Sequence, residues 1–230
     1  MEKLESIPVH QDLEEIKRRL HTKQCGDWPR VKTLIETAQP LIKPRATYKD
    51  SYIESKLEDA IIIDGIRLTS RVLRKQIDKA NRVFPYVISI GKQLEEKIRD
   101  CKDILDQYYL DTVGNVALST ARKYLKCKLM SKYAINGLSS MSPGSLSDWP
   151  IEEQKPLFSI LGDVETAVGV TVTENFLMVP TKSISGIYFP TDLPFYSCQL
   201  CSRKNCDSRK ARFDKALARE YNISEHQDIH

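Results

Sequence analysis

The stretch VTENFLMVPTKSISGIYF, residues 172–189, decides the fold of this chain. Its β-branched and aromatic residues are typical of strands, and they occur on both sides of Pro180. We therefore predict a hairpin, with strands at residues 170–179 and 184–189 that turn around Pro180.

The residues before this hairpin predict a loop and then a helix. Residues 138–149 are rich in serine, proline and glycine, which favours a loop. Ser147 or Asp148 can cap a helix that starts near Pro150. Pro156 is expected to kink or restart this helix, because proline lacks the backbone N–H that donates the helical hydrogen bond.

Three motifs in this region resemble the activation domain of cobalamin-dependent methionine synthase. In that family an R-x-x-P-G-Y stretch precedes a short helix, a strand like LTESFAMxP follows, and SVSGxYF comes after a turn. Here the counterparts are Ser142-Pro143-Gly144, residues 172–180 and residues 183–189, and the close match covers about residues 140–190. A weaker helical match extends upstream to about residue 85. The resemblance implies an α+β fold, with a twisted, largely antiparallel sheet packed against long helices.

The resemblance also implies a ligand groove. The groove for S-adenosylmethionine would be lined by Ser142, Pro143 and Gly144. The family holds this ligand with the Arg and Tyr of its motif and with a Glu on a preceding helix. Those three positions correspond here to Ser140, Ser145 and Ser119. A hydroxyl cannot replace charge-assisted bonds to the ligand's carboxylate and ammonium, so we expect S-adenosylmethionine to bind weakly or not at all.

A cysteine cluster follows the matched segment. Cys198, Cys201 and Cys206 form a C-x2-C-x4-C pattern whose short loops can bring the sulfurs onto one metal. The pattern predicts an iron–sulfur cluster or zinc and does not separate the two, and unmetallated thiols are a third reading. A fourth zinc ligand would be solvent or one of His226, His230, Cys25, Cys101 and Cys127. Cys101 and Cys127 lie in helical patterns and are expected to be buried.

Composition and length favour one cytoplasmic protein. The 230 residues suffice for one large domain or for one domain with an appendage, and the net charge of +4 is too small to imply a nucleic-acid or membrane partner. The first residues contain no apolar leader, and apolar runs such as 60–63 are too short to span a bilayer. We expect an N-terminal helical segment (1–45), a core like the activation domain (46–190) and a cysteine-cluster extension with a terminal helix (191–230).

Periodicity predicts the remaining elements. Residues 83–90 read as a buried strand, and Asp64-Gly65 marks a hairpin turn. Helices are expected at residues 10–22, from Trp28 to about Pro40, and at 70–81, 94–108, 111–133 and 208–221.

The resemblance implies an accessory protein for a cobalamin-dependent methyltransferase. In the family, one electron and a methyl group from S-adenosylmethionine reactivate cob(II)alamin, with the activation domain docked over the corrinoid. The partner expected here is a corrinoid protein that holds the cobalamin, and an iron–sulfur cluster on the cysteines could supply the electron. The alternative is a non-catalytic binding or assembly module with structural zinc.

The basic residues near the cysteines would compensate an anionic cluster or contact an acidic partner. They are Arg203, Lys204, Arg209, Lys210 and Arg212. Nucleic-acid binding in the manner of a zinc knuckle is the less favoured reading. The sequence contains no G-x-S-x-G, P-loop or G-x-G-x-x-G motif, so it does not predict a self-contained hydrolase or nucleotide-dependent enzyme. Whether the chain is itself catalytic is left open by its sequence.

Overall fold

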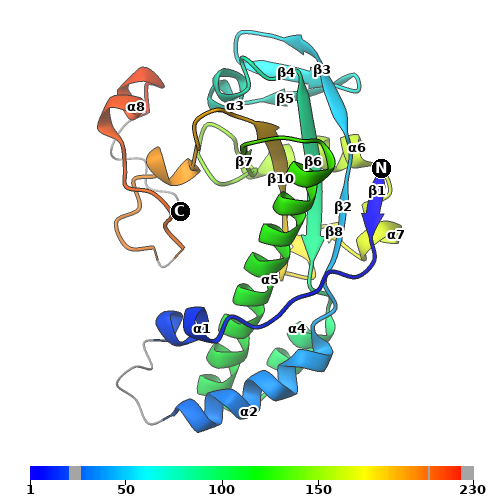
Figure 1. Cartoon of the computed structure of the whole chain (residues 1–230), viewed down its shortest axis with the longest axis vertical. Coiled ribbons are helices and arrows are strands. Elements are labelled where there is room, and N and C mark those ends of the chain that lie inside the picture. The colour runs from blue at the N-terminus through cyan, green and yellow to red at the C-terminus, as the bar shows by residue number, and fades with distance from the viewer. Residues whose placement is uncertain (21–26, 207, 224–230) are drawn as a thin grey trace.

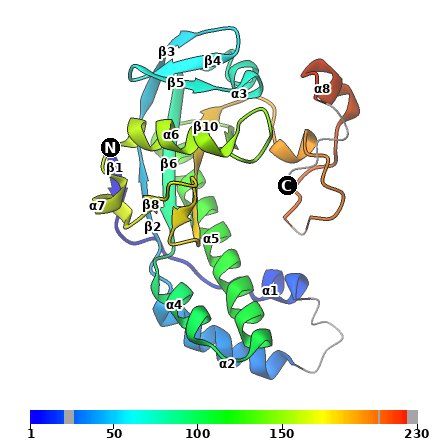
Figure 2. The same ribbon diagram turned by 180° about the vertical axis from the view of Figure 1, so that it is seen from behind.

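The structure, a computed structural model, describes residues 1–20, 27–206 and 208–223. An eight-stranded antiparallel sheet forms its centre, with the long helix α5 on one side and α6 and α7 on the other (Figures 1 and 2). The strands of this sheet are β1 (Glu2–Leu4), β2 (Arg45–Tyr48), β3 (Ser51–Lys56), β4 (Ala60–Ile63), β5 (Ile66–Thr69), β6 (Arg82–Ser89), β7 (Leu138–Met141) and β10 (Ser183–Pro190). A separate two-stranded ribbon contains β8 (Thr171–Val172) and β9 (Met178–Val179).

The helices surround this sheet and extend beyond one end of it. They are α1 (Leu13–Arg19), α2 (Trp28–Ala38), α3 (Arg71–Gln76), α4 (Gln93–Asp100), α5 (Ile104–Lys132), α6 (Gln154–Leu161), α7 (Val164–Val168) and α8 (Lys215–Glu220). The helices α1, α2 and α4 pack around the N-terminal part of α5, which extends beyond the sheet (Figure 1). No helix of the described residues is both long and apolar enough to cross a membrane.

Strand β6 is the centre of the sheet, as the buried run at residues 83–90 predicted. It pairs with β10 on one side and with β2 and β3 on the other. Side chains alternate between the two faces of a strand, so Phe84, Tyr86 and Ile88 pack in the cluster under α5. Val87 instead packs in the cluster formed with α6 and α7. Because both faces are covered, every residue from Val83 onward in the strand is buried.

The predicted hairpin at Asp64-Gly65 is confirmed. It connects β4 to β5, which pair in an antiparallel register with Ile63 opposite Ile66. Both turn residues have positive φ, 50° at Asp64 and 73° at Gly65, as the two-residue turn that matches strand twist requires.

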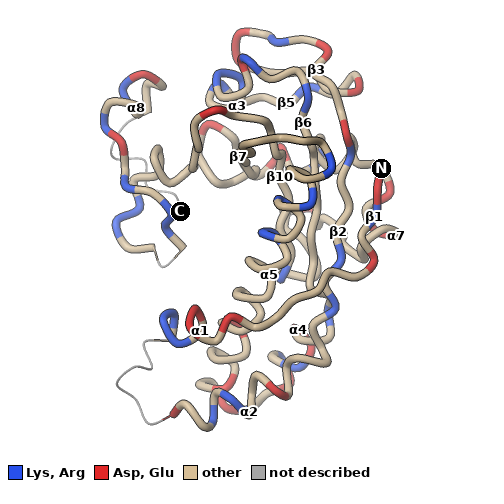
Figure 3. Tube along the Cα trace, in the orientation of Figure 1, with Lys and Arg blue, Asp and Glu red and all other residues tan. Residues whose placement is uncertain are grey.

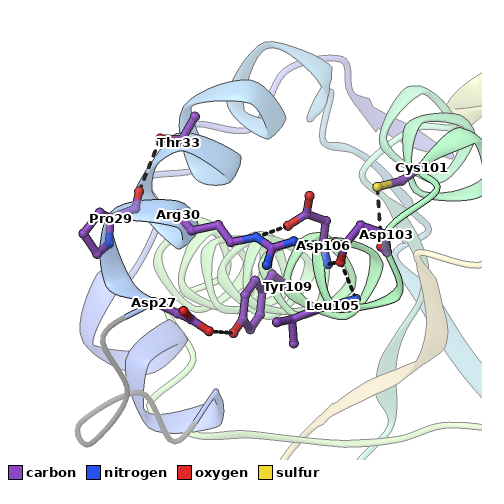
Figure 4. A network of polar contacts seen from close by, with 9 residues as sticks. All are labelled: Asp27, Pro29, Arg30, Thr33, Cys101, Asp103, Leu105, Asp106 and Tyr109. Atoms are coloured by element: carbon purple, nitrogen blue, oxygen red, sulfur yellow. Dashed lines mark hydrogen bonds and ion pairs between the residues drawn. The ribbon is translucent and has the colours of Figure 1, made fainter.

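The helix boundary in residues 94–133 differs from the prediction. The sequence predicted a break near residue 110, whereas α4 ends at Asp100 and a single helix, α5, begins at Ile104. The Asp103 carboxylate caps α5, since its Oδ1 accepts hydrogen bonds from the amides of Leu105 (2.8 Å) and Asp106 (3.0 Å; Figure 4). The apolar periodicity continues across the segment between α4 and α5, so the sequence pattern did not reveal that Asp103 starts a new helix.

The network in Figure 4 fixes α2 against the start of α5. The Arg30 guanidinium contacts Asp103 at 2.8 Å and Asp106 at 2.6 Å. The Tyr109 hydroxyl donates to the Asp27 carboxylate at 2.9 Å. These contacts join the N-terminal segment to the core. Residues of both parts also pack in the same hydrophobic cluster.

The hairpin predicted from residues 170–179 and 184–189 is wrong. Strand β10 pairs with β6 and β7, and β8 pairs with β9 instead. Residues 138–149 are also not wholly a loop, because β7 opens them and pairs with β10. Local composition indicated strands correctly, but pairing between segments far apart in the chain depends on tertiary packing.

Several helix predictions need smaller corrections. Asp148 does not cap a helix at Pro150: its carboxylate accepts from the Val72 amide at 2.9 Å and from the Ser70 hydroxyl at 2.6 Å, at the start of α3. A 3-10 turn over Ile151–Glu153 starts the helical segment beside Pro150, and α6 follows from Gln154 with Pro156 in its first turn, where the missing N–H costs no bond. Helices α3 and α8 are shorter than the predicted spans, and residues 21 and 22 of the first predicted helix lie outside the described residues.

The two helical cysteines are not buried as predicted. Cys127 is exposed and Cys101 is half-buried. Leu125 and Leu129 of α5 are fully buried. Cys127 lies two residues from each, which places it on the opposite side of the helix.

Candidate functional site

A cavity of about 560 Å³ lies between α5, β7 and the C-terminal segment 194–210. We call it the α5 cavity. Strand β10 contributes Ile184 and Tyr188 to its wall, and α1 contributes Arg19. Its volume suits a small organic molecule.

The Ser142–Gly144 turn that the sequence singled out forms part of the rim. Ser142 lines the α5 cavity, whereas Pro143 is buried and Gly144 is exposed behind it. The turn is closed by the Ser145 amide, which donates to the Ser142 carbonyl at 3.1 Å. Gly144 has a φ of 76°, which favours glycine at this position.

The three serines at the family's charged or aromatic positions all line the same cavity. Ser119 comes from α5, Ser140 from β7 and Ser145 from the following turn. The upstream helix and the Pro-Gly loop, which are distant in sequence, therefore meet here. No Asp or Glu is among the described residues that line the cavity.

Arg122 is the residue of this site that sequence reasoning missed. Its Nη2 donates to the Ser140 hydroxyl at 2.7 Å, so a guanidinium reaches the position of the family's arginine from a different element. The Tyr188 hydroxyl donates to the Arg122 backbone carbonyl at 3.1 Å. Position 122 is one helical turn after Ser119, and this spacing was the available signal.

Of the three clustered cysteines, Cys198 lines the α5 cavity and Cys201 and Cys206 do not. A 3-10 turn over Ser197–Gln199 carries Cys198, which lines the cavity and whose sulfur accepts a hydrogen bond from the Lys210 amide at 3.4 Å. Cys201 packs against a third hydrophobic cluster, which includes Trp149, Phe195 and Leu200 and which we call the Trp149 cluster, and Cys206 is half-buried.

Arg209 holds the backbone of the segment from Cys198 to Cys206, which we call the cysteine loop, through three hydrogen bonds. Its guanidinium donates to the carbonyl oxygens of Cys198 (3.1 Å), Cys201 (3.3 Å) and Arg203. Within residues 1–20, 27–206 and 208–223, no three His, Cys, Asp or Glu side chains gather so as to hold an ion. Of the candidate fourth ligands, Cys25, His226 and His230 lie outside the described residues.

The cavity wall is electropositive. The pKa of the Lys210 ammonium is lowered from the ordinary lysine value, first by desolvation and next by repulsion from Arg122. Lys123 and Lys126 lower it further, whereas Cys198 acts in the opposite direction. These cations thus lie close enough to repel one another.

Comparisons with known proteins agree with this arrangement. The family model described as "Vitamin B12 dependent methionine synthase, activation domain" matches residues 141–213, a range that begins at the end of β7 and includes the cysteine loop. The crystal structure of the MetH reactivation domain bound to AdoHcy has a similar fold, with a TM-score of 0.52 and 17% sequence identity. The similarity covers 77% of this chain and 70% of that one. No curated protein matches the sequence.

These findings confirm two predictions. The first is the α+β fold with a largely antiparallel sheet and long helices. The second is the resemblance read from the motifs: residues 141–213 match the activation-domain family of vitamin B12-dependent methionine synthase, within a chain that has the fold of the MetH reactivation domain.

Proposed function

We propose that this chain is an accessory protein that activates a cobalamin-dependent methyltransferase by docking on the protein that carries the corrinoid. The observation that carries the proposal is the family match, because residues 141–213 contain the Ser142–Gly144 rim, β10 and the cysteine loop. The fold of the rest of the chain supports it.

The chemistry to be supported is a one-electron reduction followed by methyl transfer. Cob(II)alamin takes one electron from a low-potential electron-donor protein and becomes cob(I)alamin. Cob(I)alamin then takes the methyl group from the sulfonium of S-adenosylmethionine, and S-adenosylhomocysteine leaves. The chain has Ser119, Ser140 and Ser145 where the family has its ligand contacts. We therefore assign docking on the corrinoid protein to this chain, and the methyl donor to another component.

The partner can be captured from the source cell. Anaerobic affinity purification of the tagged chain should enrich a cobalamin-binding protein or its methyltransferase. Arg203 and Lys204 are exposed beside the cysteine loop, so changing both to Glu should weaken capture about tenfold and reduce its salt dependence. The matched control reverses Lys97 and Lys102, which are exposed near the end of α4, and should not change capture. Capture of RNA or DNA with no corrinoid protein would refute the proposal.

The cysteine triplet gives a separate prediction from the sequence. We predict that the purified chain contains zinc or iron, and that Cys198→Ser, Cys201→Ser or Cys206→Ser lowers the bound metal strongly. Cys127→Ser is the control, because Cys127 lies on the exposed side of α5. Metal analysis with an absorption spectrum distinguishes a brown iron–sulfur protein from a colourless zinc protein. Equal metal content in all variants, or none in the wild type, would show that these are free thiols.

A further inference from the structure

We propose that the α5 cavity binds a small phosphate-bearing molecule rather than S-adenosylmethionine. The cavity contains cationic and hydroxyl groups but, among its described lining residues, no carboxylate. Phosphate binding is a property of the isolated chain, so it holds whether or not a corrinoid protein is the partner.

The first support is the charge of the lining. Its cations come from three separate elements: α1, α5 and the C-terminal segment. They are Arg19, Arg122, Lys123, Lys126 and Lys210. Basic residues, blue in Figure 3, gather in the second half of α5 and in the chain that precedes α8. Convergence of cations from different parts of the chain on one cavity is the arrangement expected around an anion.

The second support is that most of these cations form no ion pair with a carboxylate among the described residues. Arg19 is paired with Glu15 at 2.8 Å. Among the described residues, Arg122, Lys126 and Lys210 form no ion pair with a carboxylate. Arg122 is half-buried, and its guanidinium lies against the hydroxyls of Ser140, Tyr86 and Tyr188 rather than against a carboxylate. A dianionic group in the cavity would supply the missing countercharge.

The hydroxyl groups of the lining complement the cations. Ser119, Ser142 and Ser208 line the cavity in addition to Ser140, which already accepts from Arg122. A hydroxyl can donate to a phosphate oxygen, and guanidinium groups match phosphate geometry with parallel bonds. Serine and arginine together therefore favour phosphate over a lone carboxylate.

The cavity also has room and apolar surface for an organic group. Leu118, Leu138 and Ile184 line it, and Tyr196 contributes a partly exposed ring at the mouth. The ligand class is therefore a phosphate ester or diphosphate with an attached organic part, of the size that a cavity of about 560 Å³ holds.

S-adenosylmethionine has the opposite charge. Its ammonium and sulfonium groups outnumber its single carboxylate, so the molecule is a net cation. A wall lined by Arg122, Lys126 and Lys210 disfavours such a ligand. The exchange of the family's glutamate position for Ser119 removes the group that would attract the ammonium.

Calorimetric titration of the purified chain with inorganic pyrophosphate tests the proposal. We expect saturable binding with one site, and at least about tenfold weaker binding in the double variant Lys126→Gln, Lys210→Gln. Lys128→Gln is the matched control, since Lys128 is exposed on the same helix but does not line the cavity, and it should bind like the wild type. S-adenosylmethionine should show no saturation up to about 1 mM under the same conditions.

The outcomes separate specific binding of pyrophosphate in the α5 cavity from nonspecific electrostatic attraction of an anion to a basic surface. The removed charges lie on residues that make no structural ion pair, so the double variant should unfold like the wild type. No saturable pyrophosphate binding, an equal loss in the Lys128→Gln control, or tighter binding of S-adenosylmethionine than of pyrophosphate would each overturn the proposal. Citrate serves as the polycarboxylate probe, and a citrate affinity above that of pyrophosphate would overturn the assignment of phosphate.

Discussion

Replacing Gly186 with alanine should destabilise the chain by about 3 kcal/mol, the upper part of the range for overpacking a core. Gly186 lies in β10 between β6 and β7. A Cβ there would lie 2.3 Å from the Met141 carbonyl oxygen and 2.8 Å from the Ser142 hydroxyl oxygen. Because the nearer atom belongs to the backbone, it cannot turn away, and β7 with the cavity rim would have to move.

The free energy of unfolding from urea titration measures this effect. Gly114→Ala is the matched control, because its Cβ would meet the Leu94 Cδ2 atom at 3.0 Å, the end of a flexible side chain. The control also gains helix propensity of about 1 kcal/mol, so its net effect should be within about 1 kcal/mol of zero. A Gly186→Ala variant as stable as the Gly114→Ala variant would contradict the close approach of β7 to β10.

Replacing Trp149 with alanine should cost about 3–5 kcal/mol. Trp149 is fully buried in the Trp149 cluster, which it shares with Phe195 and Leu200 of the C-terminal segment. Its carbonyl accepts from the Gly144 amide at 2.8 Å, so it also closes the loop that carries the rim. Pyrophosphate binding should therefore fall together with stability.

Trp149→Phe separates ring packing from hydrogen bonding. The indole N–H of Trp149 has no hydrogen-bond partner among the described residues, so phenylalanine loses ring area without losing a bond. We expect this variant to cost less than half as much as alanine in a thermal or urea unfolding experiment. Equal losses for the two variants would contradict a role based on packing.

The sequence predicted the parts of the fold whose signals are local. Strand β6 was recognisable because both faces of it are buried, and Asp64-Gly65 specified its own turn. The pairing of β10 was not recognisable, because its neighbours β6 and β7 lie about a hundred and about fifty residues earlier in the chain. The start of α5 was missed because Asp103, a capping residue, stands inside a continuous apolar pattern.

The candidate site was predictable in part, because the motif that marks it is also a local sequence signal. The motif led to Ser142 and to the serines at positions 140 and 145, which the structure places on one cavity. The charge of that cavity was not predictable, since Arg122 and Lys210 come together only when the C-terminal segment folds back beside α5. The local sequence indicated which of the family's ligand contacts are absent. The tertiary structure shows that cationic and hydroxyl side chains surround those positions.

The most direct test of the accessory role is the affinity of this chain for its captured corrinoid protein in two states. A protein that promotes reactivation must bind the cob(II)alamin state more tightly than the methylated state, because only a difference in affinity can shift the equilibrium between them. We predict at least about tenfold tighter binding to the cob(II)alamin form, measured anaerobically with both forms of the same partner. Equal affinity for the two forms, or tighter binding to the methylated form, would contradict the account.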